Sequence, residues 1–398
     1  MYKYLFIALF FASALQGCKE ENENKPFDAG DRAPAPVTNV QVENIPGGAR
    51  ITYDRPKDES LLYVKAEYEI RPGVDKEAKA SYYLHTLTVD GFPDTSDYEV
   101  KLYSVSRGEN TSDPVTVKIK PLTPPVAEVF QSITIRETYG GVRVNFVNLA
   151  ESDVVLTLLA TDSLGDLVQA DAYYTKVKQG TFAARGFSPE KRRFGVFVRD
   201  RWNNHSDTLF AELTPKFEEQ LDKSKFKEVD LPGDTYKPHV GSGMHELWDN
   251  SWNSSSVFHT MPGSGLPQWF TFDMGVSVKL SRFKFYHRLG AGQGATDGAY
   301  TGADPRVFEI WGSNDPNPNG DWDSTWIKLG DFQSIKPSGQ PEGVVTNEDF
   351  QFSVVNGEDF DFPEGIPSVR YLRWKTDKVW GALDHCYIAE LTFWGNDQ

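Results

Sequence analysis

The chain has 398 residues, a net charge of −16, 39% hydrophobic and 25% charged residues, and two cysteines. This length predicts two to four domains, and the composition is that of a globular protein rather than a disordered chain or a membrane bundle. The acidic charge excludes nucleic acid as an expected partner, because phosphates would be repelled. Two cysteines cannot build a disulfide framework. The 33 glycines, 24 prolines and 13% aromatic residues favour an all-β chain with many turns.

The N-terminus predicts an export signal. Lys3 precedes an apolar run at residues 5–15, which is too short to cross a bilayer and has the proportions of a signal peptide. Residues 15–18 resemble the bacterial lipobox, which implies a lipoprotein signal peptide at residues 1–17 and a lipidated Cys18. An ordinary signal peptide that happens to contain a cysteine is the alternative.

A tether at residues 18–33 is predicted next. Its acidic stretch, residues 19–24, resembles the signal that directs Bacteroidetes lipoproteins to the outer face of the outer membrane, and a solvated linker is the alternative. The resemblance implies a protein that is lipid-anchored in the outer membrane and faces the cell exterior. The other cysteine, Cys386, lies in an apolar strand pattern, so a buried and unreactive thiol is predicted.

A repeated pattern predicts two consecutive β-sandwiches. Residues 47–53 recur 93 positions later as residues 140–146, and both copies begin with two glycines and continue as an alternating strand. Near the end of each copy, a Ser-Asp pair that begins at Ser112 recurs 94 positions later at Ser206. A repeat of this length with a proline-rich boundary has the size of a seven-stranded sandwich.

The first sandwich is predicted at residues 34–121 and a second of similar type at residues 122–220. The opening of the first copy at residues 33–40 and its tyrosine-bearing strand at residues 98–105 resemble a fibronectin type III domain. The second copy departs more from that pattern. The expected architecture is two consecutive immunoglobulin- or fibronectin-like sandwiches.

A third β-domain is predicted after a polar linker at residues 221–235. Nine of the ten tryptophans lie beyond residue 245, and the strand signals there alternate with period two and include no amphipathic helix, which favours a sandwich or jelly roll. The predicted strands are residues 269–274, 280–286, 307–313, 326–330, 369–375 and 388–395.

Four ordered motifs within residues 236–398 resemble the discoidin family, the galactose-binding-like jelly roll of coagulation factor C-terminal domains and many carbohydrate-binding modules. The motifs are residues 247–250, 268–275, 308–315 and 388–395. With the lipobox and the sandwiches, the whole chain is similar to multidomain surface lipoproteins of Bacteroidetes polysaccharide-utilisation loci. The expected fold is all-β, with two fibronectin-like sandwiches followed by a discoidin-like jelly roll.

The resemblance implies that sugar binds in loops at one end of the jelly roll. An aromatic face packs on the C–H surface of a sugar, and polar groups bind its hydroxyls. The candidate carbohydrate-binding residues are Trp252, His287, Arg288, Tyr300, Trp380 and His385. Burial is an open alternative for Trp252, Tyr300 and Trp380. The tryptophans expected in the core are Trp248, Trp269, Trp311, Trp374 and Trp394.

The same resemblance implies a structural Ca²⁺ held by a loop after the first strand and by a glutamate near the C-terminus. Asp249 and Glu390 stand at the matching positions, with Asn250 and Ser256 as further oxygen ligands of the kind that Ca²⁺ prefers. The usual Asp-Gly-Asp loop of the family reads Asp249-Asn250-Ser251 here, so the second carboxylate is missing.

No enzyme is predicted. The chain has no His-Glu-x-x-His, Gly-x-Ser-x-Gly or P-loop lysine motif, and an acid pair such as Asp359 and Asp361 is interpreted as a surface pair. One hypothesis is a non-catalytic cell-surface lipoprotein that captures polysaccharide through its jelly-roll loops for uptake, with importer proteins of the same locus as further partners. The alternative is an outer-membrane adhesin or structural lipoprotein that binds a protein. The fold does not choose between them, and the loop aromatics favour sugar.

Overall fold

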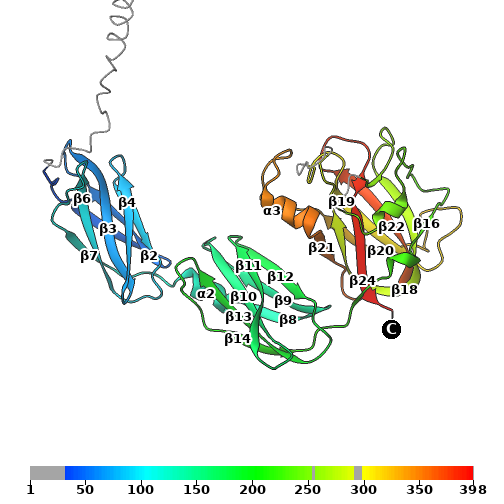
Figure 1. Cartoon of the computed structure of the whole chain (residues 1–398), viewed down its shortest axis with the longest axis horizontal. Coiled ribbons are helices and arrows are strands. Elements are labelled where there is room, and N and C mark those ends of the chain that lie inside the picture. The colour runs from blue at the N-terminus through cyan, green and yellow to red at the C-terminus, as the bar shows by residue number, and fades with distance from the viewer. Residues whose placement is uncertain (1–31, 253–255, 291–297, 398) are drawn as a thin grey trace, which may run out of the picture. The chain divides into compact units, whose positions relative to one another are not determined.

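A computed structural model of the chain describes residues 32–252, 256–290 and 298–397. The predicted signal peptide and Cys18 lie outside these residues. Sheets dominate the described chain, which confirms the all-β expectation (Figure 1). Two compact units are present, and the second consists of Leu213–Gln398 with two short segments, Arg136–Val142 and Arg185–Lys191. No helix in the described part is long and apolar enough to cross a membrane.

Seven strands in two antiparallel sheets form the first sandwich (Figure 1). One sheet has the order β1-β2-β5 and the other β4-β3-β6-β7. The strands are β1 (Thr38–Ile45), β2 (Gly48–Asp54), β3 (Leu61–Arg71), β4 (Val74–Ser81), β5 (Thr86–Asp90), β6 (Tyr98–Ser106) and β7 (Val115–Ile119). Alternate residues of β3, such as Val64, Ala66 and Tyr68, point into the core, because successive side chains of a strand face opposite sides.

The second sandwich repeats this strand order after a short helix, α2 (Pro125–Ser132). Its sheets have the orders β8-β9-β12 and β11-β10-β13-β14, which match those of the first sandwich strand for strand. The strands are β8 (Thr134–Thr138), β9 (Gly141–Val147), β10 (Val154–Thr161), β11 (Leu167–Thr175), β12 (Gln179–Arg185), β13 (Arg192–Asp200) and β14 (Leu209–Leu213). The sequence repeat therefore corresponds to a repeated topology.

The C-terminal domain is a jelly roll built around one long strand, β18 (Gln268–Tyr286). The main sheet path is β15-β24-β18-β22-β19-β20; β16 and β21 also pair with β18, and β17 pairs with β23. The other elements are β15 (Glu219–Gln220), η2 (Lys223–Lys225), β16 (Lys227–Val229), η3 (Met244–Leu247), β17 (Phe258–His259), β19 (Pro305–Ser313), β20 (Ile327–Gln333), α3 (Asn347–Phe350), η4 (Gln351–Val355), β21 (Glu358–Asp361), β22 (Val369–Val379), β23 (Tyr387–Ile388) and β24 (Glu390–Asn396).

β18 passes through both sheets of the roll. Its first half pairs with β22 and its second half with β24, and the register shifts between Asp273 and Val278. Gly275 lies in this shift with a φ of +76°, and a Cβ there would lie 2.7 Å from Cβ of Lys225. Only glycine fits both the left-handed backbone and the close approach, so the bend of β18 depends on this residue.

Aromatic rings fill the core of the jelly roll. Trp374 is 1% exposed, and its ring centroid lies 4.3 Å from that of Phe308 in a stacked pair. The prediction that Trp374 belongs to the core is confirmed. Trp248 packs against the same core from its edge. The other three tryptophans expected in the core are only half-buried, because they lie at the sheet surface; they are Trp269, Trp311 and Trp394.

The segment predicted as a linker, residues 221–235, is part of the jelly roll instead. Just before it, β15 pairs with β24, and within it β16 pairs with β18. Leu221 and Phe226 are 5% and 6% exposed and belong to the aromatic core. Most residues of the segment are polar, so the sequence alone suggests a linker although these two apolar residues are buried.

Candidate functional site

The ends of three neighbouring strands lie together at one end of the jelly-roll sheet. β19 lies between β22 and β20, and all three run antiparallel to their neighbours. The start of β19 therefore lies beside the end of β22 and the end of β20. Two backbone hydrogen bonds extend this pairing, from Trp380 N to Asp304 O at 2.9 Å and from Ser334 N to Arg306 O at 2.9 Å.

A surface pocket of about 350 Å³ opens beside these strand ends. Arg306, at the start of β19, is exposed, and its guanidinium carbon lies 4.5 Å from the ring centroid of the half-buried Trp380. The remaining lining residues come from the end of β20 and the following loop: Gln333, Ser334, Ile335, Lys336, Gly339, Gln340, Pro341 and Glu342. The pocket combines an aromatic ring, apolar side chains and several exposed polar groups.

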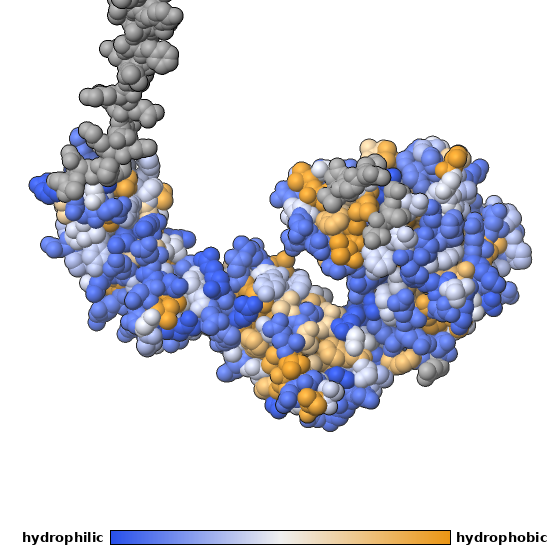
Figure 2. Space-filling view, in the orientation of Figure 1, coloured by the Kyte–Doolittle hydropathy of each residue, from blue (hydrophilic) through white to orange (hydrophobic). Residues whose placement is uncertain are grey.

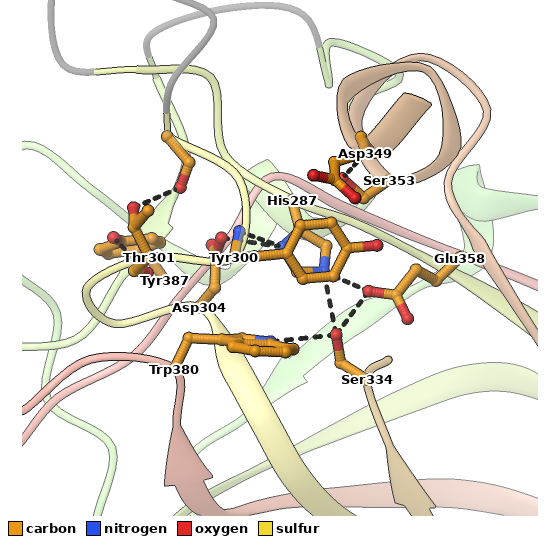
Figure 3. A network of polar contacts seen from close by, with 11 residues as sticks. His287, Tyr300, Thr301, Asp304, Ser334, Asp349, Ser353, Glu358, Trp380 and Tyr387 are labelled. Atoms are coloured by element: carbon orange, nitrogen blue, oxygen red, sulfur yellow. Dashed lines mark hydrogen bonds and ion pairs between the residues drawn. The ribbon is translucent and has the colours of Figure 1, made fainter. Parts of the chain in front are cut away.

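A buried polar network orients the Trp380 ring through a hydrogen bond to its indole nitrogen (Figure 3). The indole nitrogen of Trp380 donates to Ser334 Oγ at 3.1 Å, and Ser334 Oγ donates to Glu358 Oε1 at 2.6 Å. Glu358 also accepts from His287 Nε2, while His287 Nδ1 lies 2.8 Å from Asp304 Oδ2. The imidazole thus lies between two carboxylates, and the orientation of Trp380 depends on it through Ser334.

The two carboxylates beside His287 favour the charged form of its imidazole. Complete burial alone would lower its pKa, but the two carboxylates of Asp304 and Glu358 outweigh burial and raise the pKa to about 9. All three side chains are nearly or fully buried, at 0%, 0% and 3% exposure. They form a support under the pocket, and none of the three reaches its surface.

The loop that forms the outer wall of the pocket is tied down by two buried side chains. Lys336 Nζ donates to Pro341 O at 2.9 Å and also to Val344 O. The carboxylate of Asp349 accepts from Ser338 N at 3.0 Å and from Ser338 Oγ at 2.7 Å. Burial raises the pKa of Asp349, but these bonds and those from Thr346 lower it more, so the net shift is downward. These hydrogen bonds hold the wall of the pocket together.

Apolar side chains are exposed on the same domain near helix α3. Figure 2 shows a hydrophobic patch in this region. Ile335, Val344, Phe352 and Val355 are 67%, 49%, 43% and 42% exposed. A contiguous exposed apolar patch is a feature of binding surfaces.

Two of the six predicted sugar-binding residues are fully buried, which corrects the expectation that they form a surface. His287 is 0% exposed for the reason given above, and Tyr300 is 0% exposed because it packs beneath the loops with Ala299 and Val354. The Tyr300 ring stands edge-on to Trp380 at 5.1 Å. Both residues support Trp380 and do not contact solvent.

Three other predicted residues do not line the pocket. Trp252 is half-buried against the Tyr286 ring at 5.0 Å, and His385 is 7% exposed and stacks on His259 at 5.0 Å. The Arg288 guanidinium lies 5.0 Å from the Tyr387 ring. Of the predicted set, only Trp380 lines the pocket.

Two of the predicted calcium ligands, Asp249 and Glu390, have protein partners in this structure. Glu390 is 0% exposed; one carboxylate oxygen pairs with Lys223 Nζ, and the other accepts from Asn250 N at 3.0 Å. Asp249 accepts from Ser251 N at 2.8 Å. Burial, partly offset by Lys223, raises the pKa of Glu390 to about 7. In the described residues, no group of three or more His, Cys, Asp or Glu side chains is arranged to hold a metal.

Sequence reasoning missed most of the pocket. Gln333, Gln340 and Glu342 carry no motif, and they meet Arg306 only because β19 and β20 are neighbours in the sheet. Arg306 itself ends a loop that the sequence marks as a candidate, because it directly precedes a predicted strand, where recognition residues are often found. Cys386 is 1% exposed, and burial raises its pKa to about 11, as expected for an unreactive thiol.

The pocket offers binding chemistry. Its one lining carboxylate, Glu342, is exposed, whereas the carboxylates of Glu358 and Asp304 are sealed beneath the pocket by His287 and Ser334. Asp359 pairs with Arg282 at 3.4 Å. An aromatic ring with polar groups around it is the arrangement that recognises a flat, hydroxylated ligand.

Three family models match consecutive parts of the chain, and each is described as a domain of unknown function. They are DUF4959 at residues 34–121, DUF5126 at residues 122–224 and DUF5000 at residues 248–395. No curated protein matches the chain.

Solved structures also match the chain. A SusE-like protein is 32% identical, and the match covers 69% of this chain and all of that one, with a TM-score of 0.44. A family 32 carbohydrate-binding module from a family 31 glycoside hydrolase of Clostridium perfringens is 17% identical over 44% of this chain and 95% of its own, with a TM-score of 0.33. A family 32 module of NanJ from C. perfringens, solved with galactose, is 14% identical over 44% and 98%, with a TM-score of 0.30.

Proposed function

The chain belongs to the family of SusE-like proteins, and from this premise we propose that it is a non-catalytic protein that binds carbohydrate at the bacterial cell surface. The pocket beside Trp380 is the proposed binding site. The observation that carries the proposal is the half-buried Trp380 ring at the pocket edge, which bonds Ser334 and has the exposed Arg306 guanidinium over one face.

Each part of the pocket has a role in this proposal. The accessible part of the Trp380 ring packs on the C–H face of a sugar, while Arg306, Gln333 and Gln340 bond its hydroxyls. The volume of about 350 Å³ is at the lower end for ligand sites, which suits a short stretch of a glycan rather than a long groove. The two sandwiches act as spacers between this domain and the membrane.

The membrane anchor is part of the same proposal. Lipidation of Cys18 holds the protein in the outer membrane, and the acidic tether directs it to the exterior. Several acyl chains anchor a protein firmly where a single chain does not. Captured polysaccharide is passed to importer proteins encoded in the same locus.

The proposal is tested with purified protein on a glycan array, followed by isothermal titration calorimetry with any glycan found. Saturable binding that Trp380→Ala weakens supports the assigned site. Binding of equal affinity in Trp380→Ala places the sugar elsewhere on the chain. Absence of binding across a broad set of glycans contradicts the function itself.

The apolar patch near α3 favours one alternative, a surface adhesin that binds a protein. Phe352 and Val355 are 43% and 42% exposed, which is more apolar surface than a sugar site requires. Replacing Phe352 with Asp would abolish binding of a protein partner and leave binding of a glycan in the Trp380 pocket intact. The two functions therefore separate in a single pair of variants, Trp380→Ala and Phe352→Asp.

A further inference from the structure

The position of Lys223 is fixed by core packing on both sides. Leu221 and Phe226 are 5% and 6% exposed, and the Phe226 ring lies 5.7 Å from Trp248 and 5.9 Å from Phe272. The backbone between them forms the turn η2, in which Asp222 caps the N–H of Ser224 at 3.0 Å. Because the turn is short and anchored on both sides, the side chain of Lys223 points into the domain, and it is 7% exposed.

The buried ammonium meets a buried carboxylate. Lys223 Nζ pairs with Glu390 Oε1, across 167 positions of sequence, and Glu390 is 0% exposed. The second oxygen of Glu390 accepts from Asn250 N at 3.0 Å, so both oxygens have partners. Burial lowers the pKa of Lys223, while Glu390 and, more weakly, Asp249 favour its charged form.

Asp249, Asn250 and Glu390 are residues that the family resemblance gives as ligands of Ca²⁺. A buried carboxylate needs a nearby cation, because burial without one costs several kcal/mol. Calcium needs six to eight oxygen ligands, whereas here an ammonium group occupies one oxygen of the central carboxylate. The second carboxylate of the usual loop is also absent, since Ser251 stands in its place.

We propose that Lys223 is a built-in cation that replaces calcium in this jelly roll. Its ammonium group joins three segments distant in sequence: the turn η2, the loop at Asp249–Asn250 through Glu390, and the first residue of β24. The domain therefore keeps its fold without a metal ion. This inference rests on the ion pair and does not depend on the proposed function.

The first test compares the wild-type protein in EDTA and in millimolar calcium. A ligand that binds the folded state raises its melting temperature. We expect the same melting temperature in both buffers and no heat of calcium binding by calorimetry. A saturable rise with calcium that Asp249→Asn removes would overturn the proposal. This measurement needs no variant of Lys223.

The second test removes the ammonium group. Lys223→Met leaves Glu390 buried without its cation and should lower the melting temperature by roughly 10 °C. The double variant Lys223→Met with Glu390→Gln removes both charges and should melt higher than Lys223→Met alone. The matched control is Lys225→Met, which removes an exposed lysine of the same turn and should melt like wild type.

The pattern among these variants decides the outcome. If the double variant melts no higher than Lys223→Met, the two residues act independently and the proposal fails. It also fails if Lys223→Met melts like Lys225→Met. If Lys223→Met does not fold, expression of the double variant as a folded protein supports the pair, and its failure to fold contradicts it.

Discussion

The indole nitrogen of Trp380 donates a 3.1 Å hydrogen bond to Oγ of Ser334. Ser334 in turn donates to Glu358, which pairs with the buried His287. An aromatic side chain at the mouth of a pocket is thereby oriented by a charged group in the interior. A preorganised ring loses little entropy on binding, so this connection bears directly on affinity.

Replacing Trp380 with alanine should weaken glycan binding without unfolding the domain. Loss of one aromatic platform costs about 1–3 kcal/mol, by analogy with base stacking, which is roughly tenfold to a hundredfold in Kd. Calorimetry measures the loss, and Trp252→Ala is the control because Trp252 lies outside the pocket. A melting temperature as low as that of a core variant such as Trp374→Ala would mean that Trp380 is structural.

Arg306 should matter more for binding than Arg288. Arg306 is exposed beside Trp380 in the pocket, whereas Arg288 lies over Tyr387 and does not line it. Arg306→Ala removes charge-assisted hydrogen bonds worth about 1.5–3 kcal/mol, while Arg288→Ala should leave the affinity unchanged. Titration of both variants with the same glycan decides the point, and equal losses would contradict the assigned site.

Stability should fall as the pH rises above neutrality. His287 has a pKa of about 9 in the folded state against an ordinary value of 6.5. Its stabilising charge is fully present below pH 6.5 and is lost as the pH passes through 9. The shift corresponds to about 3 kcal/mol.

Urea unfolding followed by tryptophan fluorescence measures this pH effect, since nine of the ten tryptophans lie beyond residue 245. His287→Gln should remove most of the fall between pH 6.5 and 9. Should that variant not fold, titration of the wild-type imidazole by NMR gives the pKa directly. A value near or below 6.5 would contradict the charged state.

Cys18→Ala should release the protein from the membrane fraction or leave the precursor uncleaved. The matched control is Cys386→Ala, because Cys386 is a buried thiol, 1% exposed, that no acyl transfer reaches. Metabolic labelling with a fatty acid, followed by fractionation, measures both variants. Label retained in Cys18→Ala would show that the lipid is attached elsewhere.

The sequence by itself determined the local structure of this protein. Period-two alternation placed the strands, and the repeat between residues 47–53 and 140–146 marked two sandwiches that share one strand order. Apolar context identified Trp374 as a core residue. These properties depend on residues close in sequence, where the alternation of apolar and polar residues predicts a strand.

Only the tertiary structure decided the site. The sequence predicts His287 and Tyr300 as loop residues, yet both are buried. Asp304 and Glu358 contact His287, and Val354 packs against Tyr300, all from other segments of the chain. Lys223 reads as part of a polar linker, yet it neutralises Glu390. Such pairings join residues far apart in the chain, and which residues meet depends on which strands are neighbours in the sheet.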